Sequence, residues 1–287
     1  LMTANVAAGV VDQVINTTGI VQARAVAQQG GQIILDGGDN GAVMVAGALD
    51  ASGRGAGQSG GTVNVLGNNV QLASNAVVDV SGDAGGGTAL IGGNFHGSGT
   101  QRKAATTTIA KGAKILADAI SSGKGGQVAI WSEQSTNFDG TVSAKGGAQG
   151  GDGGQVETSG AQLLVSADAS VDASAANGAA GDWLLDPSGN LYGNSAGSLP
   201  AGAPAGSSAF STTSVQTTLN GGTNVTETAN QDLIVTSPIA WNSGASLNLN
   251  AGHSILIEAP ITHTFTTNGA TLNLNYGTST GLMDVAG

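Results

Sequence analysis

Short runs in which apolar and polar residues alternate recur along most of the chain, and each follows a pair of small residues, usually Gly-Gly. Every second position in these runs is Val, Ile, Leu or Ala, which is typical of a β-strand with one buried face and one outward face. The runs recur about every 28 residues, a period typical of repeat architectures. They begin at Gly30, Gly60, Gly86, Gly125, Gly153 and Ala180. The longest interval contains a polar insert near residues 94–105.

Each repeat contains further short strands. In the repeat that begins at Gly60, alternating segments cover 63–65, 70–72 and 77–81. Three such strands suit a coil of triangular section, with apolar side chains inside and polar ones outside. The next coil would stack on it at about 4.8 Å and pair each strand in parallel with its equivalent. The pattern therefore predicts an all-β fold, a parallel β-helix.

Antiparallel hairpins in a β-sandwich are the rival interpretation of the same turns. Asn40-Gly41 and Asn177-Gly178 are hairpin-type dipeptides. Hairpins, however, require no repeat near 28 residues, and the similarity here is between repeats rather than between neighbouring strands. The spacing therefore favours the β-helix.

The repeat pattern stops after Pro187. Residues 188–209 are mostly Ser, Gly, Ala, Pro and Asn, with little to bury, and are interpreted as a surface excursion outside the β-helix. Within the excursion, residues 211–221 carry a weak helix pattern with Ser and Thr at its start and glycine at its end. We divide the chain into Gly-rich coils over 1–187, a polar excursion with a short helix over 188–222, and a final part.

That final part, residues 223–287, returns to alternating strands. The segment 245–250 (Ala-Ser-Leu-Asn-Leu-Asn) closely matches the segment 270–275 (Ala-Thr-Leu-Asn-Leu-Asn). Asparagine here takes the place of the Gly-rich corners. We expect Asn-rich β-helix coils that share one core with the first part.

Composition and charge exclude several function classes. The chain has 49 Gly, 9% charged residues and a formal net charge of −11. All eight basic residues lie before residue 146, so the second half cannot neutralise phosphates, which disfavours nucleic acid and anionic membranes as partners. No apolar stretch approaches the roughly 18 residues of a membrane span, so membrane insertion is not expected. The lack of Cys fits export in an unfolded state across an oxidising compartment.

Several segments in this order resemble large exoproteins of two-partner secretion systems. They are 9–16 with 47–53, then 125–132, 182–187, and 224–226 with 247–249. The nearest resemblance is to filamentous haemagglutinins and high-molecular-weight adhesins. It implies export through an outer-membrane β-barrel partner, a right-handed β-helix at the cell surface, and adhesion or filament formation. The Asn-Pro-Asn motifs of that family's secretion domain do not occur in the sequence, so the chain is interpreted as shaft downstream of that domain.

The expected function is a structural and adhesive segment of a secreted bacterial surface protein. Its expected partners are the secretion barrel during export and a receptor or glycan on a host or neighbouring cell. One alternative is a subunit that polymerises end to end with other copies of itself. Another is a β-helical enzyme acting on polysaccharides, which is disfavoured because the acidic residues are scattered and the second half lacks any Lys or Arg. No catalytic residue and no cofactor is predicted.

Candidate contact residues are few. His96, Arg102 and Lys103 lie in the polar insert, the most basic part of the chain, and are predicted to form a partner-binding loop. Asn16 and Asn224 begin Asn-x-Thr sequences and are formal glycan acceptors. The three histidines are not closely spaced, so no metal site is predicted. Trp131, Trp183 and Trp241 each lie in an apolar strand, which favours burial over a role in binding sugar.

Overall fold

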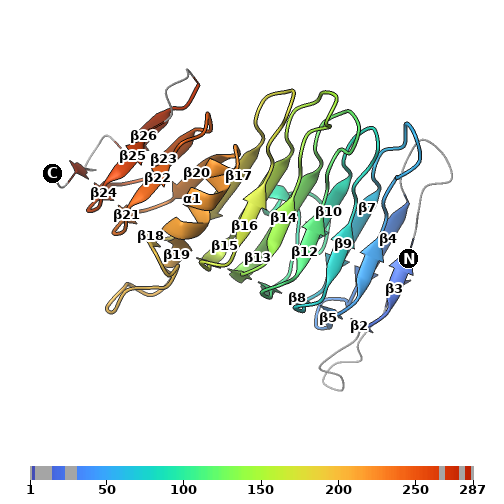
Figure 1. Ribbon diagram of the computed structural model, residues 1–287. Helices are drawn as coiled ribbons and strands as arrows, with labels where there is room; N and C mark the ends of the chain where they lie inside the picture. Colours follow the sequence, from blue (N-terminus) through green and yellow to red (C-terminus); the bar gives the residue numbers. More distant parts are fainter. Residues whose placement is uncertain (1, 4–14, 23–30, 265–268, 278–281, 286–287) are drawn as a thin grey trace.

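The computed structural model of the chain describes residues 2–3, 15–22, 31–264, 269–277 and 282–285. These residues form a mostly β-structure in which strands lie side by side along one long axis, from β3 and β4 near the N-terminus to β26 near the C-terminus (Figure 1). All pairings between the described strands are parallel. This arrangement is consistent with a parallel β-helix and excludes antiparallel hairpins from the described part of the chain.

The strands occupy three faces. On the first face, in stacking order, lie β1 (Met2–Thr3), β4 (Gln32–Asp36), β7 (Thr62–Leu66), β10 (Thr88–Ile91), the first halves of β13 (Gln127–Phe138) and β15 (Gln155–Val165), β17 (Asp182–Pro187), β20 (Asn224–Ala229), β23 (Leu247–Ala251) and β26 (Leu272–Tyr276). On the second lie β2 (Ile15–Thr17), β5 (Ala42–Val45), β8 (Asn69–Leu72), β11 (Thr106–Ile109), the second halves of β13 and β15, β19 (Ser208–Ser211), β18 (Leu191–Asn194), β21 (Leu233–Val235), β24 (Ile255–Ile257) and β27 (Met283–Val285). On the third lie β3 (Ile20–Gln22), β6 (Ala48–Asp50), β9 (Val77–Asp79), β12 (Lys114–Leu116), β14 (Thr141–Ser143) and β16 (Ser170–Asp172), with β22 (Ile239–Trp241) and β25 (Ile261–His263) as a separate pair.

The register aligns apolar side chains into columns that form the core. Alternate residues of each strand point inward, and parallel pairing sets equivalent residues of successive repeats above one another. One such buried column on the first face comprises Val63, Ala89, Val128, Val156, Trp183, Val225 and Leu247. The core is therefore continuous from the Gly-rich repeats into the Asn-rich ones.

The corner between the third and first faces is closely packed backbone. A Cβ atom built on Gly153 would lie 1.8 Å from the carbonyl oxygen of Ala173. Glycine pairs precede the first-face strands because no side chain fits there, which explains the repeated Gly-Gly of the sequence.

The segment after Pro187 corrects one expectation. It is not an extrahelical excursion throughout, because β18 and β19 join the second face between β15 and β21. Only residues 195–207 form an irregular connection between these two strands (Figure 1). The burial of Leu191 and Phe210 explains why so polar a segment still joins the stack.

A helix, α1 (Thr212–Asn220), follows β19 and lies where the sequence carries its weak helix pattern. Ser211 caps it by accepting hydrogen bonds from the backbone N–H groups of Thr213 and Ser214. Val215 and Leu219 are fully buried, and the helix packs against β16 and β22. It therefore fills the place between the two sheets of the third face.

Candidate functional site

The loop between β10 and β11 folds back over the outer side of the first face. This insert, residues 92–105, contains a short 3-10 helix, η1 (Phe95–Gly97). A Cβ atom on Gly97, whose φ is +59°, would lie 2.4 Å from Cζ2 of Trp131, and one on Gly93 would lie 2.8 Å from Cε3. Glycine at these two positions therefore lets the loop backbone lie directly against the Trp131 indole.

A buried carboxyl group fastens the tip of the insert. Both carboxylate oxygens of Glu157 on β15 accept a hydrogen bond from the backbone N–H of His96, each at 3.0 Å. The Ser159 hydroxyl donates to the same carboxyl group. The Glu157 side chain is only 1% exposed, because the insert covers it. This burial raises the pKa of Glu157, although the hydrogen bonds from Ser159 and His96 oppose the effect.

The His96 side chain lies between two carboxyl groups. Its Nδ1 is 3.7 Å from Oδ2 of Asp186 on β17 and 3.9 Å from Oε2 of Glu157. His96 also has a positive φ of 53°, which is uncommon for a residue other than glycine. The imidazole is 62% exposed and is available to a ligand.

A cavity of about 410 Å³ opens beside His96 on the outer surface. Its walls include His96, Trp131, Glu133, Ser159, Asp186 and Asn230. A second cavity of about 240 Å³ lies on the other side of the same histidine, bordered by Phe95, Glu157, Asp182 and Thr226 among others. We call the larger one the insert cavity. Its volume falls within the range of roughly 300–1,000 Å³ of small-ligand sites.

The three residues of the predicted partner-binding loop have different surroundings. His96 borders both cavities. Lys103 places its Nζ 5.7 Å from the centroid of the Trp131 ring, a cation–π contact. Arg102 points toward β4, donates from Nε to Oδ1 of Asp36 at 2.8 Å, and forms a further ion pair with Asp39. Arg102 thus anchors the end of the insert, and His96 is the residue that reaches a cavity.

Trp131, Glu157 and Asp186 are the residues that the sequence analysis did not connect with the insert. Each lies on a different repeat, and the stacking of β13, β15 and β17 brings them together. Trp183 and Trp241 are buried as predicted. Trp131 differs because it lies at an outward position and borders the insert cavity.

The two formal glycan acceptors also differ. Asn16 on β2 is exposed. The Asn224 amide donates from Nδ2 to Oδ1 of Asp182 at 3.2 Å and accepts from the backbone N–H of Ser246 at 2.9 Å. Since the Asn224 amide is engaged by two neighbouring strands and Asn16 is exposed, the geometry favours Asn16.

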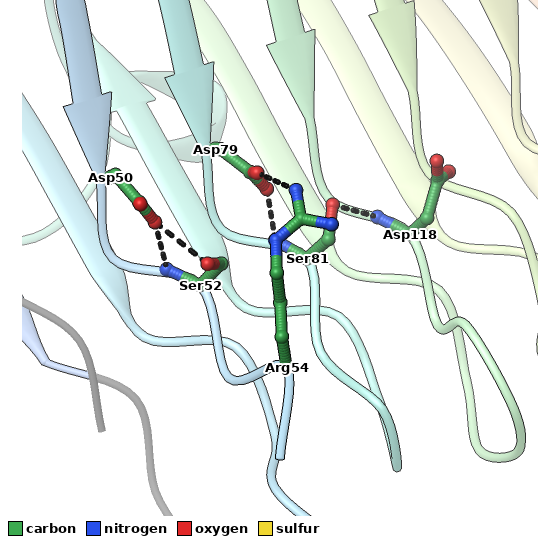
Figure 2. Close-up of polar contacts among 6 residues, drawn as sticks. All are labelled: Asp50, Ser52, Arg54, Asp79, Ser81 and Asp118. Atoms are coloured by element: carbon green, nitrogen blue, oxygen red, sulfur yellow. Dashed lines mark hydrogen bonds and ion pairs between the residues drawn. The ribbon is translucent and has the colours of Figure 1, made fainter. Parts of the chain in front are cut away.

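A second polar cluster lies at the ends of the third-face strands (Figure 2). Asp50 accepts from the backbone N–H and the hydroxyl of Ser52, and Asp79 accepts from the backbone N–H of Ser81 and pairs with Arg54. The bonds from Ser52 and Ser81 span two residues and close a turn in successive repeats, whereas the ion pair of Arg54 with Asp79 joins two repeats. The Asp-x-Ser cluster is therefore explained by local turn structure.

Within the described ranges, no group of three or more His, Asp or Glu side chains is placed to hold a metal ion. No helix in the same residues is long and apolar enough to cross a membrane. No family model matches the chain, and no curated protein is significantly similar to it in sequence. The functional interpretation therefore depends on the geometry of the stack and of the insert.

Proposed function

We propose that the chain is a right-handed β-helical shaft segment of a secreted bacterial surface protein, a rod that displays binding loops. The observation that carries the proposal is the in-register parallel stacking of the first face from β4 through β26. Each strand hydrogen-bonds to the equivalent strand of the next repeat, so adding repeats adds length rather than bulk. A shaft segment needs only this length, because its role is to hold binding loops away from the cell surface.

The two irregular segments support the display of loops. The 92–105 insert and the 195–207 connection leave the stack, and the strands on either side of them remain paired. Loops on a rigid scaffold are frequent sites of binding. The rod supplies position, and the insert with its cavity supplies a surface for a receptor or glycan.

Export through an outer-membrane β-barrel partner belongs to the same proposal. It is supported by the absence of Cys and by the resemblance to two-partner exoproteins. Immunogold labelling of intact producing cells tests the location, and we expect gold on the outer surface. Label that appears only after the cells are permeabilised would contradict it.

A filament subunit is the second candidate. It is supported by the parallel pairing of the described strands, because strands of a second copy could pair in the same way with the unpaired edge of a stack. Electron microscopy of the purified chain separates the candidates. Isolated short rods support the shaft segment, whereas long uniform fibres support the filament and globular particles contradict both.

A further inference from the structure

We propose that the insert cavity binds an uncharged oligosaccharide that runs along the rod from the cavity over the outer side of the first face. The inference rests on the proposed function, because it names the chemical class of partner that the displayed insert recognises. Three observations support the inference: the composition of the cavity, the fixed position of the cavity walls, and the polar side chains that continue from the cavity along the first face.

The charges at the cavity disfavour an acidic ligand. The carboxyl groups of Glu133 and Asp186 border it, and none of the described residues that line it is Lys or Arg. The nearest Lys amine, that of Lys103, lies over the Trp131 ring. A sialylated, sulfated or phosphorylated group would meet the like charge of two carboxylates, which opposes binding.

The polar groups suit hydroxyl groups. Hydroxyls donate hydrogen bonds to carboxylates and accept them from amides and imidazoles. Glu133 and Asp186 supply acceptors, and Asn230 and His96 supply groups that donate or accept. The part of the half-buried Trp131 ring that the insert leaves uncovered borders the same cavity, and the C–H face of a sugar ring can pack against such apolar surface. Polar and charged side chains outnumber apolar ones in these walls, which suits a ligand rich in hydroxyl groups.

The walls are held in place before any ligand arrives. The Glu157 carboxyl group holds the His96 backbone, and Arg102 ties the end of the insert to Asp36. Gly93 and Gly97 lie against Trp131. Binding therefore does not have to order the loop, which lowers its entropic cost.

Uncharged polar side chains continue the surface beyond Asp186. The next strand, β20, presents Thr226 and Thr228 outward, and their hydroxyls contact the amides of Asn248 and Asn250 on β23. The last pair, Asn273 and Asn275 on β26, continues both columns. The columns repeat at about 4.8 Å, close to the length of one pyranose unit, so successive sugars would meet equivalent groups.

A printed glycan array with neutral oligosaccharides and their sialylated and sulfated counterparts provides the test. We expect the purified chain to bind neutral members, and to bind a longer neutral chain more tightly than its own disaccharide. Calorimetry with the best neutral ligand should show roughly tenfold weaker binding for Glu133→Gln and for Asp186→Asn, since each loses a charged acceptor. Glu258→Gln, which removes an exposed carboxylate outside the cavity, should bind like the wild type.

Each contrary result overturns a defined part of the inference. Binding to no neutral glycan, or equal binding to sialylated forms, overturns the ligand class. Neutral binding that Glu133→Gln and Asp186→Asn leave unchanged overturns the site, and cleavage of the bound glycan contradicts a pure binding role. Failure of the proposed shaft is recognised separately, because globular particles in electron microscopy would refute the rod even if the sugar bound.

Discussion

The Gly-rich and Asn-rich regions build the same parallel stack with different side-chain chemistry. In the first region, from β4 to β17, Asp-x-Ser turns close three of the third-face strands, β6, β9 and β16, at Asp50, Asp79 and Asp172. In the second region, from β20 to β26, Asn248 and Asn250 pair with Asn273 and Asn275 one repeat further on. The backbone register is common to both regions, so it defines the fold, and the polar side chains only adjust corners and outer faces.

The cores of the two regions differ more than their surfaces. The inward positions of β7, β10 and β13 on the first face carry aliphatic side chains. On β20, by contrast, Glu227 points inward, stands in register between Leu185 and Leu249, and is fully buried. Neither of its carboxyl oxygens has a hydrogen-bond partner among the described residues. Burial raises the pKa of Glu227 well above its usual value. The Asn-rich region therefore contains a buried carboxyl group without a hydrogen-bond partner. In the described part of the Gly-rich region, from β4 to β17, the unpartnered buried side-chain atom is the neutral amide oxygen of Asn64.

The largest effect is expected at a Gly-rich corner. Gly153→Ala would place its Cβ 1.8 Å from the Ala173 carbonyl oxygen, so two strands would have to separate. We expect a loss of about 3 kcal/mol or more in unfolding free energy, measured by denaturant titration. Gly19→Ala is the matched control, because among the described residues, its two chain neighbours aside, no atom lies within 4 Å of its added Cβ. Equal stability of the two variants would refute the close backbone stacking.

Removing the buried carboxyl group should stabilise the Asn-rich region. Glu227→Leu replaces an unpaired polar group by the residue type of its neighbours, Leu185 and Leu249. We expect a gain of about 1–3 kcal/mol at pH 7, measured by the same titration. A loss of stability would show that Glu227 has a polar partner in solution.

The gain should depend on pH in a defined direction. Since the pKa of Glu227 is raised in the folded state, its neutral form is favoured there, and stability is highest below its unfolded pKa of about 4.3. Stability should then fall as the pH rises through the folded pKa. Glu227→Gln cannot ionise, so its unfolding free energy should not show this decrease. The difference in unfolding free energy between the wild type and Glu227→Gln should therefore widen as the pH rises. A difference that stays constant would contradict burial of the carboxyl group.

A smaller effect is expected at the Asp-x-Ser turns. Asp79→Ala removes the acceptor for the backbone N–H of Ser81, 2.9 Å away, and the ion pair with Arg54. We expect a loss of about 1 kcal/mol in thermal or chemical unfolding. Asp79→Asn keeps an acceptor and should lose less, since Arg54 is exposed and a surface ion pair adds little. If both variants lost the same amount, the ion pair rather than the turn would be the stabilising element.

The smallest effect belongs to the Asn-rich face. Asn275→Ala removes one exposed hydrogen bond, from Nδ2 to Oδ1 of Asn250, which is 2.8 Å long. Exposed cross-strand pairs contribute about 0.2–1 kcal/mol, so unfolding should change by a few tenths of a kcal/mol. A loss larger than that of Asp79→Ala would mean that the asparagine columns, rather than the backbone register, hold this region together.

Sequence patterns predicted the strands but not every part of the stack. Alternation in β7 or β20 gives a clear signal because inward and outward positions differ in polarity. The strands β18 and β19 were missed because Leu191 and Phe210 stand among Gly, Ser and Asn, so too few apolar residues mark them. Glu227 could have been noticed, since it occupies an inward position between Val225 and Ala229.

The insert shows a second limit of prediction from the sequence. Its polarity and basic residues mark it as a contact loop, and His96 does reach a cavity. Glu157 and Asp186 could not be assigned to the same site, because that requires knowing which strands stack beneath the loop. Once the repeats are aligned, outward residues of the three following repeats become natural candidates for a site under an insert.

The most direct test of the account measures distances along the stack. The chain has no Cys, so pairs of nitroxide labels can be introduced between Thr62 and each later member of one first-face column. The column comprises Thr62, Thr88, Gln127, Gln155, Asp182 and Asn224. Double electron–electron resonance should show that the distance from the label at Thr62 rises by about 4.8 Å with each strand. The same increment is expected between β17 and β20, although the whole 188–222 segment separates them in the sequence. Distances that follow sequence separation, or that do not increase along the column, would contradict the parallel stack.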